Sequence, residues 1–118
     1  MTGAANDKTA MQERLQQLGA QFLLRTRGEI ASLKESLQRV RAGDTAALLD
    51  LERLAHKIHG TGATLGFDGV SAHAEAIERF AERRDGAAID ASSCDHIAES
   101  IAKLGSEVDS VAAAQGLK

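Results

Sequence analysis

The residues best suited to chemistry lie between Leu54 and Phe67, in the segment LAHKIHGTGATLGF, where a histidine stands among small residues. At about 100° per residue in a helix, His56 points away from the apolar stripe that contains Leu51 and Ile58. A neutral imidazole nitrogen is a nucleophile that needs no separate base, so it can accept a phosphoryl group directly. The pattern therefore predicts an exposed and nucleophilic His56.

The helix surface around this histidine is unusually small and apolar. Gly60 lies one turn after His56, although a glycine inside a helix costs about 1 kcal/mol relative to alanine. We interpret Gly60 as a residue that leaves space beside the imidazole for a bulky group. Leu49, Ala63 and Phe67 continue the same strip, where a solvated helix normally carries charges. The strip predicts a docking surface for a partner.

Phosphoryl transfer also needs cations or hydrogen-bond donors around the negative charge of the transferred group. Lys57 and His59 follow His56 within one turn, and Arg53 precedes it by three residues. Residues at these spacings are close to each other on a helix surface. We expect all three to be able to reach a phosphate, with Arg53 also at the rim of the docking surface.

Composition limits the classes of protein. The 118 residues suit one domain, and 14 basic against 17 acidic residues give a net charge of −3. With three Phe and no Trp or Tyr, the chain lacks the basic field and the stacking aromatics of a nucleic-acid binder. One Cys excludes an internal disulfide and a CxxC pair. We expect a cytoplasmic protein, because there is neither a membrane-spanning apolar run nor a leader-like N-terminus.

The elements that must position His56 are helices. The chain has no Pro and is rich in good helix formers. Glycines and capping residues divide it into a disordered tail (1–8), a short lid-like helix (9–18), and helices at about 20–42, 45–65, 68–84 and 92–113, with a flexible end (114–118). Ser92 and Asp95 resemble a capping box at the start of the last helix. The pattern predicts an all-α fold, an antiparallel four-helix bundle with a short additional N-terminal helix over residues 9–113.

The segment 55–66 resembles the signature of histidine phosphotransfer (HPt) domains. In that family a phosphorylated His is followed by an apolar residue two positions on, Lys or Arg three on, Gly four on, and then small residues with a Leu-Gly pair. The matching positions here are His56, Ile58, Gly60, Leu65 and Gly66. His59 departs from the pattern, because it replaces the usual Lys or Arg with a side chain whose charge depends on pH.

The resemblance implies a phosphocarrier, not an enzyme, within a two-component phosphorelay. It would accept a phosphoryl group from the aspartyl-phosphate of one response-regulator receiver domain and pass it to another, with a hybrid histidine kinase upstream. The receiver supplies Mg²⁺ in such transfers, so no cofactor or metal of this chain's own is expected, and we expect a monomer. In such domains a polar residue of the next helix orients the phosphorylated His, and Glu78 is the candidate that would leave Nε2 free to attack.

Three other interpretations are weaker. A metal-binding bundle could draw on Glu and His side chains, but their spacing does not match the inward-facing Glu-x-x-His pairs of di-iron bundles. The phosphoacceptor helix of a sensor kinase usually has a proline after its histidine, and this chain has none. A docking module that is never phosphorylated stays open. The residues available for the metal alternative are Glu52, His56, His59, His73 and Glu78.

Overall fold

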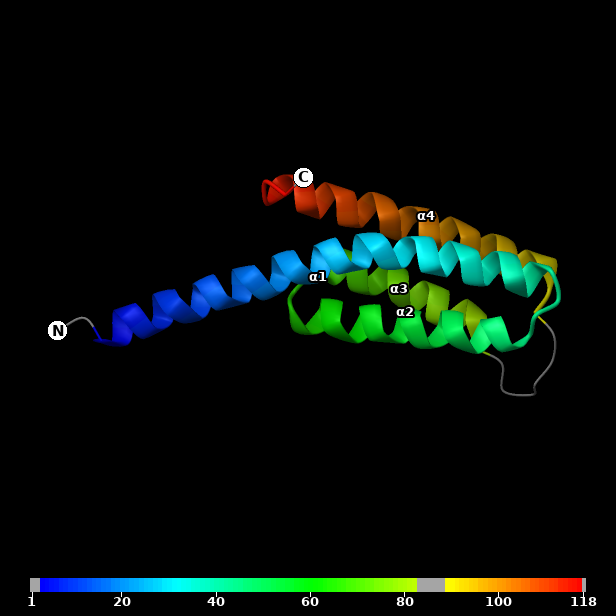
Figure 1. Cartoon of the computed structure of the whole chain (residues 1–118), viewed down its shortest axis with the longest axis horizontal. Helices are drawn as coiled ribbons and strands as arrows, with labels where there is room; N and C mark the ends of the chain where they lie inside the picture. The colour runs from blue at the N-terminus through cyan, green and yellow to red at the C-terminus, as the bar shows by residue number, and fades with distance from the viewer. Residues whose placement is uncertain (1–2, 83–88, 118) are drawn as a thin grey trace.

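The computed structural model describes residues 3–82 and 89–117, and within these ranges the chain forms helices and no β-strand. Each helix runs in the opposite direction to the one before it, and each packs on two neighbours to form an antiparallel bundle (Figure 1). The predicted all-α four-helix bundle is confirmed. The four helices are α1 (Gly3–Arg41), α2 (Ala46–Thr64), α3 (Asp68–Ala81) and α4 (Ala91–Ala114).

The core of the bundle is built from one apolar face of each helix. These faces follow the three- and four-residue spacings in the sequence, and their large side chains are fully buried. Each such side chain contributes roughly 1.5–3 kcal/mol on burial, so the core fixes how α2 and α3 sit against each other. Its fully buried members include Leu23 and Leu33 of α1, Leu51 and Ile58 of α2, Val70 and Ile77 of α3, and Ile97, Ile101, Leu104 and Val108 of α4.

α1 is one continuous helix of 39 residues, whereas the sequence analysis predicted separate helices at 9–18 and 20–42. Gly19 does not break it. A Cβ at Gly19 would lie 3.1 Å from Cζ of Phe67, so the glycine allows an aromatic ring to pack on the helix. This packing offsets the low helix propensity of glycine. The structure also places residues 3–8, predicted to be a disordered tail, in the first turns of α1.

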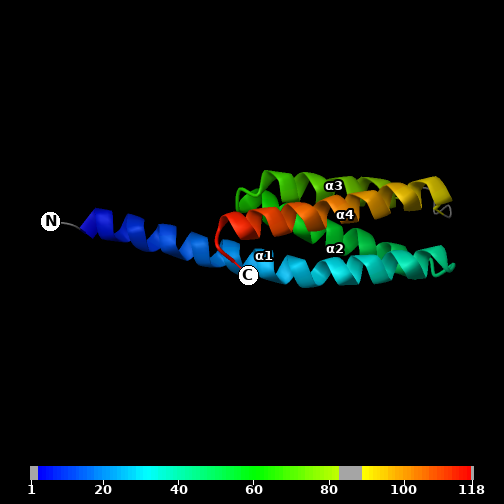
Figure 2. The same cartoon turned by 90° about the horizontal axis from the view of Figure 1, so that it is seen from above.

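The N-terminal part of α1 projects beyond the other three helices (Figures 1 and 2). The molecule measures 63 × 28 × 17 Å. A helix of this length spans roughly 58 Å at 1.5 Å per residue, so α1 alone accounts for most of the long axis. Met11 and Leu15, two apolar residues of the segment predicted to be a lid-like helix, are 66% and 54% exposed. The expectation of a lid is therefore wrong, because this segment extends away from the bundle.

Specific caps set the ends of α2. At its start, Oδ1 of Asp44 accepts a hydrogen bond from the backbone N–H of Ala46 at 3.1 Å. At its end, Gly66 has φ of +84°, and the backbone N–H of Phe67 donates to the carbonyl of Gly62 at 2.8 Å. This is the Schellman arrangement that a glycine permits after a helix. The predicted end of the helix at Gly66 is confirmed, and the chain reverses there directly into α3.

The boundaries of α3 and α4 differ from the predicted ones. α3 ends at Ala81, and the predicted end near residue 84 lies outside the described residues. α4 is capped by Asp90 and not by Ser92, because Oδ1 of Asp90 accepts from the backbone N–H of Ser93 at 2.7 Å. Aspartate and serine are comparable N-caps, so residue preference alone does not separate them. The predicted Ser92–Asp95 capping box is therefore wrong by about half a turn.

The chain after α4 is held against the bundle. Gly116 has φ of +75°, and the backbone N–H of Leu117 donates to the carbonyl of Ala112 at 2.9 Å. The Leu117 side chain is half-buried, packs on the core and lines a groove together with residues of α1. Residues 115–117 thus form a second Schellman cap, in place of the flexible end that was predicted for 114–118. Lys118 lies outside the described residues.

Candidate functional site

His56 lies in the middle of α2 and faces away from the core. Its side chain is 72% exposed, whereas Leu51, Ala55 and Ile58 on the opposite side of the helix are buried. The three-four periodicity of α2 explains this placement, because residues 51, 55 and 58 share a face from which residue 56 is turned away. The prediction of an exposed imidazole is confirmed.

One carboxylate of α3 joins the two histidines of α2. Oε2 of Glu78 is hydrogen-bonded to Nδ1 of His56, and Oε1 of Glu78 lies 3.0 Å from Nδ1 of His59. The two imidazole rings are 6.3 Å apart and nearly perpendicular. Glu78 therefore contacts the nitrogen of His56 that the sequence analysis expected, and it contacts His59 as well.

The charge on Glu78 determines which atoms carry protons. Its partial burial alone would raise the pKa, but hydrogen bonds to His59 and His56 and the charges of the two rings outweigh burial and lower the pKa below the ordinary 4.5. Glu78 is thus ionised at neutral pH and can only accept hydrogen bonds. Both histidines must then donate through Nδ1–H. In neutral His56 this tautomer leaves the lone pair on Nε2.

Close contact between α2 and α3 allows this arrangement. A Cβ at Gly62 would lie 3.4 Å from the backbone nitrogen of Ser71, so glycine permits the two helices to approach. The Ser71 hydroxyl donates to the carbonyl of His59 at 2.9 Å across the same contact. Gly62 has the packing role that its position on the core stripe indicates. The result is that Glu78 reaches across to α2.

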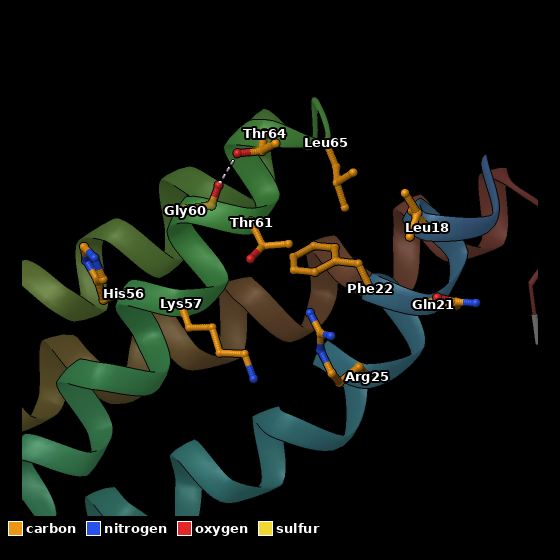
Figure 3. Close-up of a pocket in the computed structure, with 10 residues that line it drawn as sticks. All are labelled: Leu18, Gln21, Phe22, Arg25, His56, Lys57, Gly60, Thr61, Thr64 and Leu65. Atoms are coloured by element: carbon orange, nitrogen blue, oxygen red, sulfur yellow. Dashed lines mark hydrogen bonds between the residues drawn. The ribbon is translucent and has the colours of Figure 1, made fainter. Parts of the chain in front are cut away.

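Lys57 points toward α1, away from the Glu78 side of His56. Its Nζ lies 3.4 Å from Oε2 of Glu29, and Oε1 of the same carboxylate lies 3.8 Å from Nε of Arg25. Lys57 and Arg25 line a groove of about 580 Å³ between α1 and α2, which His56 and Gly60 also line (Figure 3). The groove places two cations beside His56, both in contact with Glu29.

In a comparison with protein-family models, residues 8–107 match the Hpt domain. The chain belongs to the Hpt domain family. Such domains are phosphotransfer modules of two-component signalling, and they act as carriers that interact with receiver domains and histidine kinases. Comparisons with curated proteins and with solved structures gave no match. Among the described residues, no helix combines the length and apolar character needed to cross a bilayer.

Gly60, predicted to leave access to His56, and three residues predicted to dock a partner lie on the exposed side of α2. Gly60 is exposed, and nothing in the described chain lies within 4 Å of the position its Cβ would take. Leu49 is 47% exposed, and Ala63 and Arg53 are also exposed. These four residues form an open surface around His56, which we call the α2 surface.

Phe67 is not part of the α2 surface, contrary to its predicted place on the same strip. It is half-buried, and its ring stacks on Phe22 of α1 with centroids 5.8 Å apart and planes within 8°. The prediction extended the helical spacing past the true end of α2 at Thr64. Because Gly66 reverses the chain, Phe67 turns inward to α1.

Two acidic residues of the site were missed by the sequence analysis. Glu75 lies with Oε2 3.9 Å from Nε2 of His59 and accepts from Arg79 at 2.9 Å. Its spacing of three residues from Glu78 is a signal that could have found it. Glu29, the partner of Lys57, lies on α1, and no local pattern indicates which turn of α1 faces Lys57.

The metal alternative can be compared with the side-chain positions. Within residues 3–82 and 89–117, one group of three His, Cys, Asp or Glu side chains is close enough to hold an ion: His56, His59 and Glu78. The other two residues considered for a metal lie elsewhere, with His73 facing a groove beside Glu99 and Lys103 of α4. The di-iron arrangement is therefore not formed by this set.

Proposed function

We propose that this Hpt domain carries a phosphoryl group on Nε2 of His56, accepting it from the aspartyl-phosphate of one receiver domain and passing it to another. The observation that carries this proposal is the contact between Nδ1 of His56 and the ionised Glu78, on a ring that is 72% exposed. Such a ring offers one accessible nitrogen with a lone pair.

In the proposed transfer, the Nε2 lone pair of His56 attacks phosphorus, and the bond between phosphorus and the aspartyl oxygen of the receiver breaks. The aspartate leaves with that electron pair. The imidazole becomes cationic, and its Nδ1–H stays hydrogen-bonded to Glu78, whose negative charge stabilises the cation. Transfer to the next receiver reverses these steps. The receiver supplies the Mg²⁺ for this chemistry, so the chain needs no cofactor of its own.

The charged neighbours of His56 have different proposed roles. Both ring nitrogens of His59 face carboxylates, Glu78 at 3.0 Å and Glu75 at 3.9 Å. This favours His59 as a residue that positions Glu78 over one that binds phosphate. Lys57 is the proposed phosphate-binding residue. Its exposed ammonium can leave the Glu29 carboxylate and pair with the more highly charged phosphoryl group that the receiver brings. Arg53 is proposed at the rim of the same surface.

The proposed partner is a receiver domain that docks on the α2 surface around His56. The surface combines small and apolar groups at Gly60, Ala63 and Leu49 with the cation of Arg53, which suits an acidic phosphorylation site. Gly60 leaves the space above the ring open for the approach of the donor. A monomer in the cytoplasm, where receiver domains and kinases would meet it, is the proposed working state.

Intact-mass spectrometry tests the proposal. The chain is incubated with phosphoramidate and, separately, with a phosphorylated receiver domain and Mg²⁺. We expect one acid-labile phosphate on wild type and on His96→Gln, which removes an exposed histidine of α4, and none on His56→Gln. Absence of phosphate on wild type, in conditions that label another Hpt domain, would overturn the phosphocarrier proposal. In that case the chain would be a docking module.

A further inference from the structure

We infer that His56, His59 and Glu78 form a binding site for a divalent transition metal such as Zn²⁺, and that metal binding and phosphorylation of His56 exclude each other. The second half of this inference rests on the proposed function, whereas the first half does not. One ligand atom from each of the three side chains lies within 4.8 Å of the others, so small side-chain rotations bring all three onto one ion.

The chemistry of the three groups suits zinc. Two imidazole nitrogens and one carboxylate are the set that zinc uses in sites with three protein ligands, where a fourth position stays open to solvent. Oxygen-preferring ions such as Mg²⁺ select carboxylates and water over imidazole. His56 is 72% exposed, so an ion between the rings is accessible from solvent and has room for a water ligand.

The supporting structure is already in place. His56 and His59 stand three residues apart on α2, and the close contact of Gly62 with Ser71 holds Glu78 of α3 opposite them. The carboxylate already lies between Nδ1 of each ring, where an ion would take the place of the two bridging protons. Ligand side chains that are carried by packed helices lose little conformational freedom when the site binds an ion.

A second carboxylate, that of Glu75, lies near the other ring nitrogen of His59. If Nδ1 of His59 binds the ion, its remaining proton lies on Nε2, and Oε2 of Glu75 is 3.9 Å from that atom. Glu75 is itself held by Arg79 at 2.9 Å. A carboxylate that accepts the second N–H of a ligand histidine fixes the ring and strengthens the metal bond. At 3.9 Å the two atoms are at ion-pair distance and not hydrogen-bonded, so Glu75 would position His59 in the metal site after a small shift of its side chain.

Metal binding has a direct consequence for phosphorylation. An ion bound through Nδ1 of His56 uses the lone pair of that atom, so the proton of the neutral ring moves to Nε2. Nε2 then has no lone pair with which to attack phosphorus. The same ion also binds the Glu78 carboxylate, which therefore no longer accepts the hydrogen bond from Nδ1–H of His56 that it accepts in the metal-free protein. A metal-loaded domain is thus unable to accept a phosphoryl group.

Cobalt titration of the untagged, chelator-treated chain tests the binding site. Co²⁺ gives visible absorption bands whose intensity reports its coordination, and displacement by Zn²⁺ gives the zinc affinity. We expect one Co²⁺ per wild-type chain, with affinity lowered more than roughly tenfold in His59→Ala and in Glu78→Gln. His96→Gln should bind as wild type does. Equal affinity in wild type and His59→Ala would overturn the site.

Labelling by phosphoramidate, with free Zn²⁺ set by a chelator buffer, tests the exclusion. We expect labelling of wild type to fall in proportion to zinc occupancy, and labelling of His59→Ala, measured relative to its own zinc-free rate, to stay constant at the same free zinc. Full labelling of a zinc-saturated wild type would overturn the exclusion. If metal-free wild type is not labelled at all, the proposed function fails and the exclusion with it. The cobalt titration still decides whether the site binds metal.

Discussion

Nζ of Lys57 lies 3.4 Å from Oε2 of Glu29, so the cation next to His56 in the sequence is held by α1. Glu29 is only 17% exposed, whereas Lys57 is 56% exposed. A largely buried carboxylate paired with an exposed ammonium beside a groove lowers the positive charge that a partner meets there. For the receiver domain proposed as the partner, we therefore expect the pair to oppose docking of its acidic site, even though an ion pair of this kind adds little to stability.

Replacing Glu29 with Gln should release Lys57 for the phosphate. We expect transfer from a phosphorylated receiver to accelerate about two- to threefold at low salt, because the groove becomes more positive, and the gain to vanish at high salt. Stopped-flow labelling at two salt concentrations measures both effects. Glu35→Gln removes an exposed carboxylate of α1 and makes the same change in net charge. Equal rates in the two variants would show that the contact with Lys57 has no part in docking.

Gly60→Ala should reduce the access of a receiver to His56 while leaving the folding stability unchanged or higher. Nothing in the described chain lies within 4 Å of the added methyl group, so the fold accepts it and gains up to about 1 kcal/mol from helix propensity. The methyl group stands one turn from the imidazole, where a receiver must approach. We expect receiver-dependent phosphorylation to fall roughly tenfold, while labelling by the much smaller phosphoramidate changes less than twofold.

Gly28→Ala is the matched control for this prediction. Gly28 is exposed inside α1, and nothing lies within 4 Å of its Cβ position, so the same gain in stability is expected. Thermal unfolding should give similar increases for both variants. Receiver-dependent labelling should fall only in Gly60→Ala, and a fall in Gly28→Ala of equal size would contradict a role for Gly60 in access.

Glu78→Gln should reduce phosphorylation without unfolding the protein. The amide oxygen can still accept from Nδ1–H of His56, but the charge that stabilises the imidazolium is lost. We expect the labelling rate with phosphoramidate to fall about tenfold, with circular dichroism unchanged. Glu99→Gln is the control, because it removes a surface carboxylate that pairs with Lys103 of the same helix. A wild-type rate in Glu78→Gln would show that its charge does not assist the histidine.

The pH dependence of stability should report the ionised state of Glu78. Its pKa is lower in the folded protein than the ordinary 4.5, because its hydrogen bonds to the two histidines and their charges outweigh burial. Folding stability from this group is present above pH 4.5 and is lost as the pH falls through the folded pKa. In urea denaturation of the metal-free chain, the difference in unfolding free energy between wild type and Glu78→Gln should shrink below pH 4.5. A constant difference down to pH 3 would contradict this.

The fold could be predicted from the sequence because burial in helices is a local pattern. Stripes through Leu51 and Ile58, and through Ile97 and Leu104, mark buried faces without knowledge of their partners. Gly19 could not be interpreted in this way. Its role depends on the ring of Phe67, which reaches it only when α2 has turned back along α1. From the sequence alone, a glycine that ends a helix cannot be told from a glycine against which an aromatic ring packs.

In the candidate site, too, features set by one helix could be predicted from the sequence, whereas contacts between helices could not. The exposure of His56 and the open space at Gly60 follow from the period of α2, and both predictions are confirmed. The contact between His56 and Glu78 was predicted from the family resemblance alone. Helix periodicity could not predict it, because the distance between the two side chains depends on how closely α3 approaches α2. The pairing of Lys57 with Glu29 was missed for the same reason, since it depends on the register between α1 and α2.

Leu49→Ala should weaken receiver docking while leaving the fold intact. Leu49 is 47% exposed and lies two turns before His56 on α2, so its apolar surface is available to a partner. We expect the dissociation constant for a receiver, measured by calorimetry, to rise roughly three- to tenfold. Leu24→Ala on α1 is the matched control, because Leu24 is 48% exposed and lies outside the α2 surface. If Leu24→Ala weakened binding as much as Leu49→Ala does, the receiver would dock on another face, and the apolar strip before His56 would have no part in recognition.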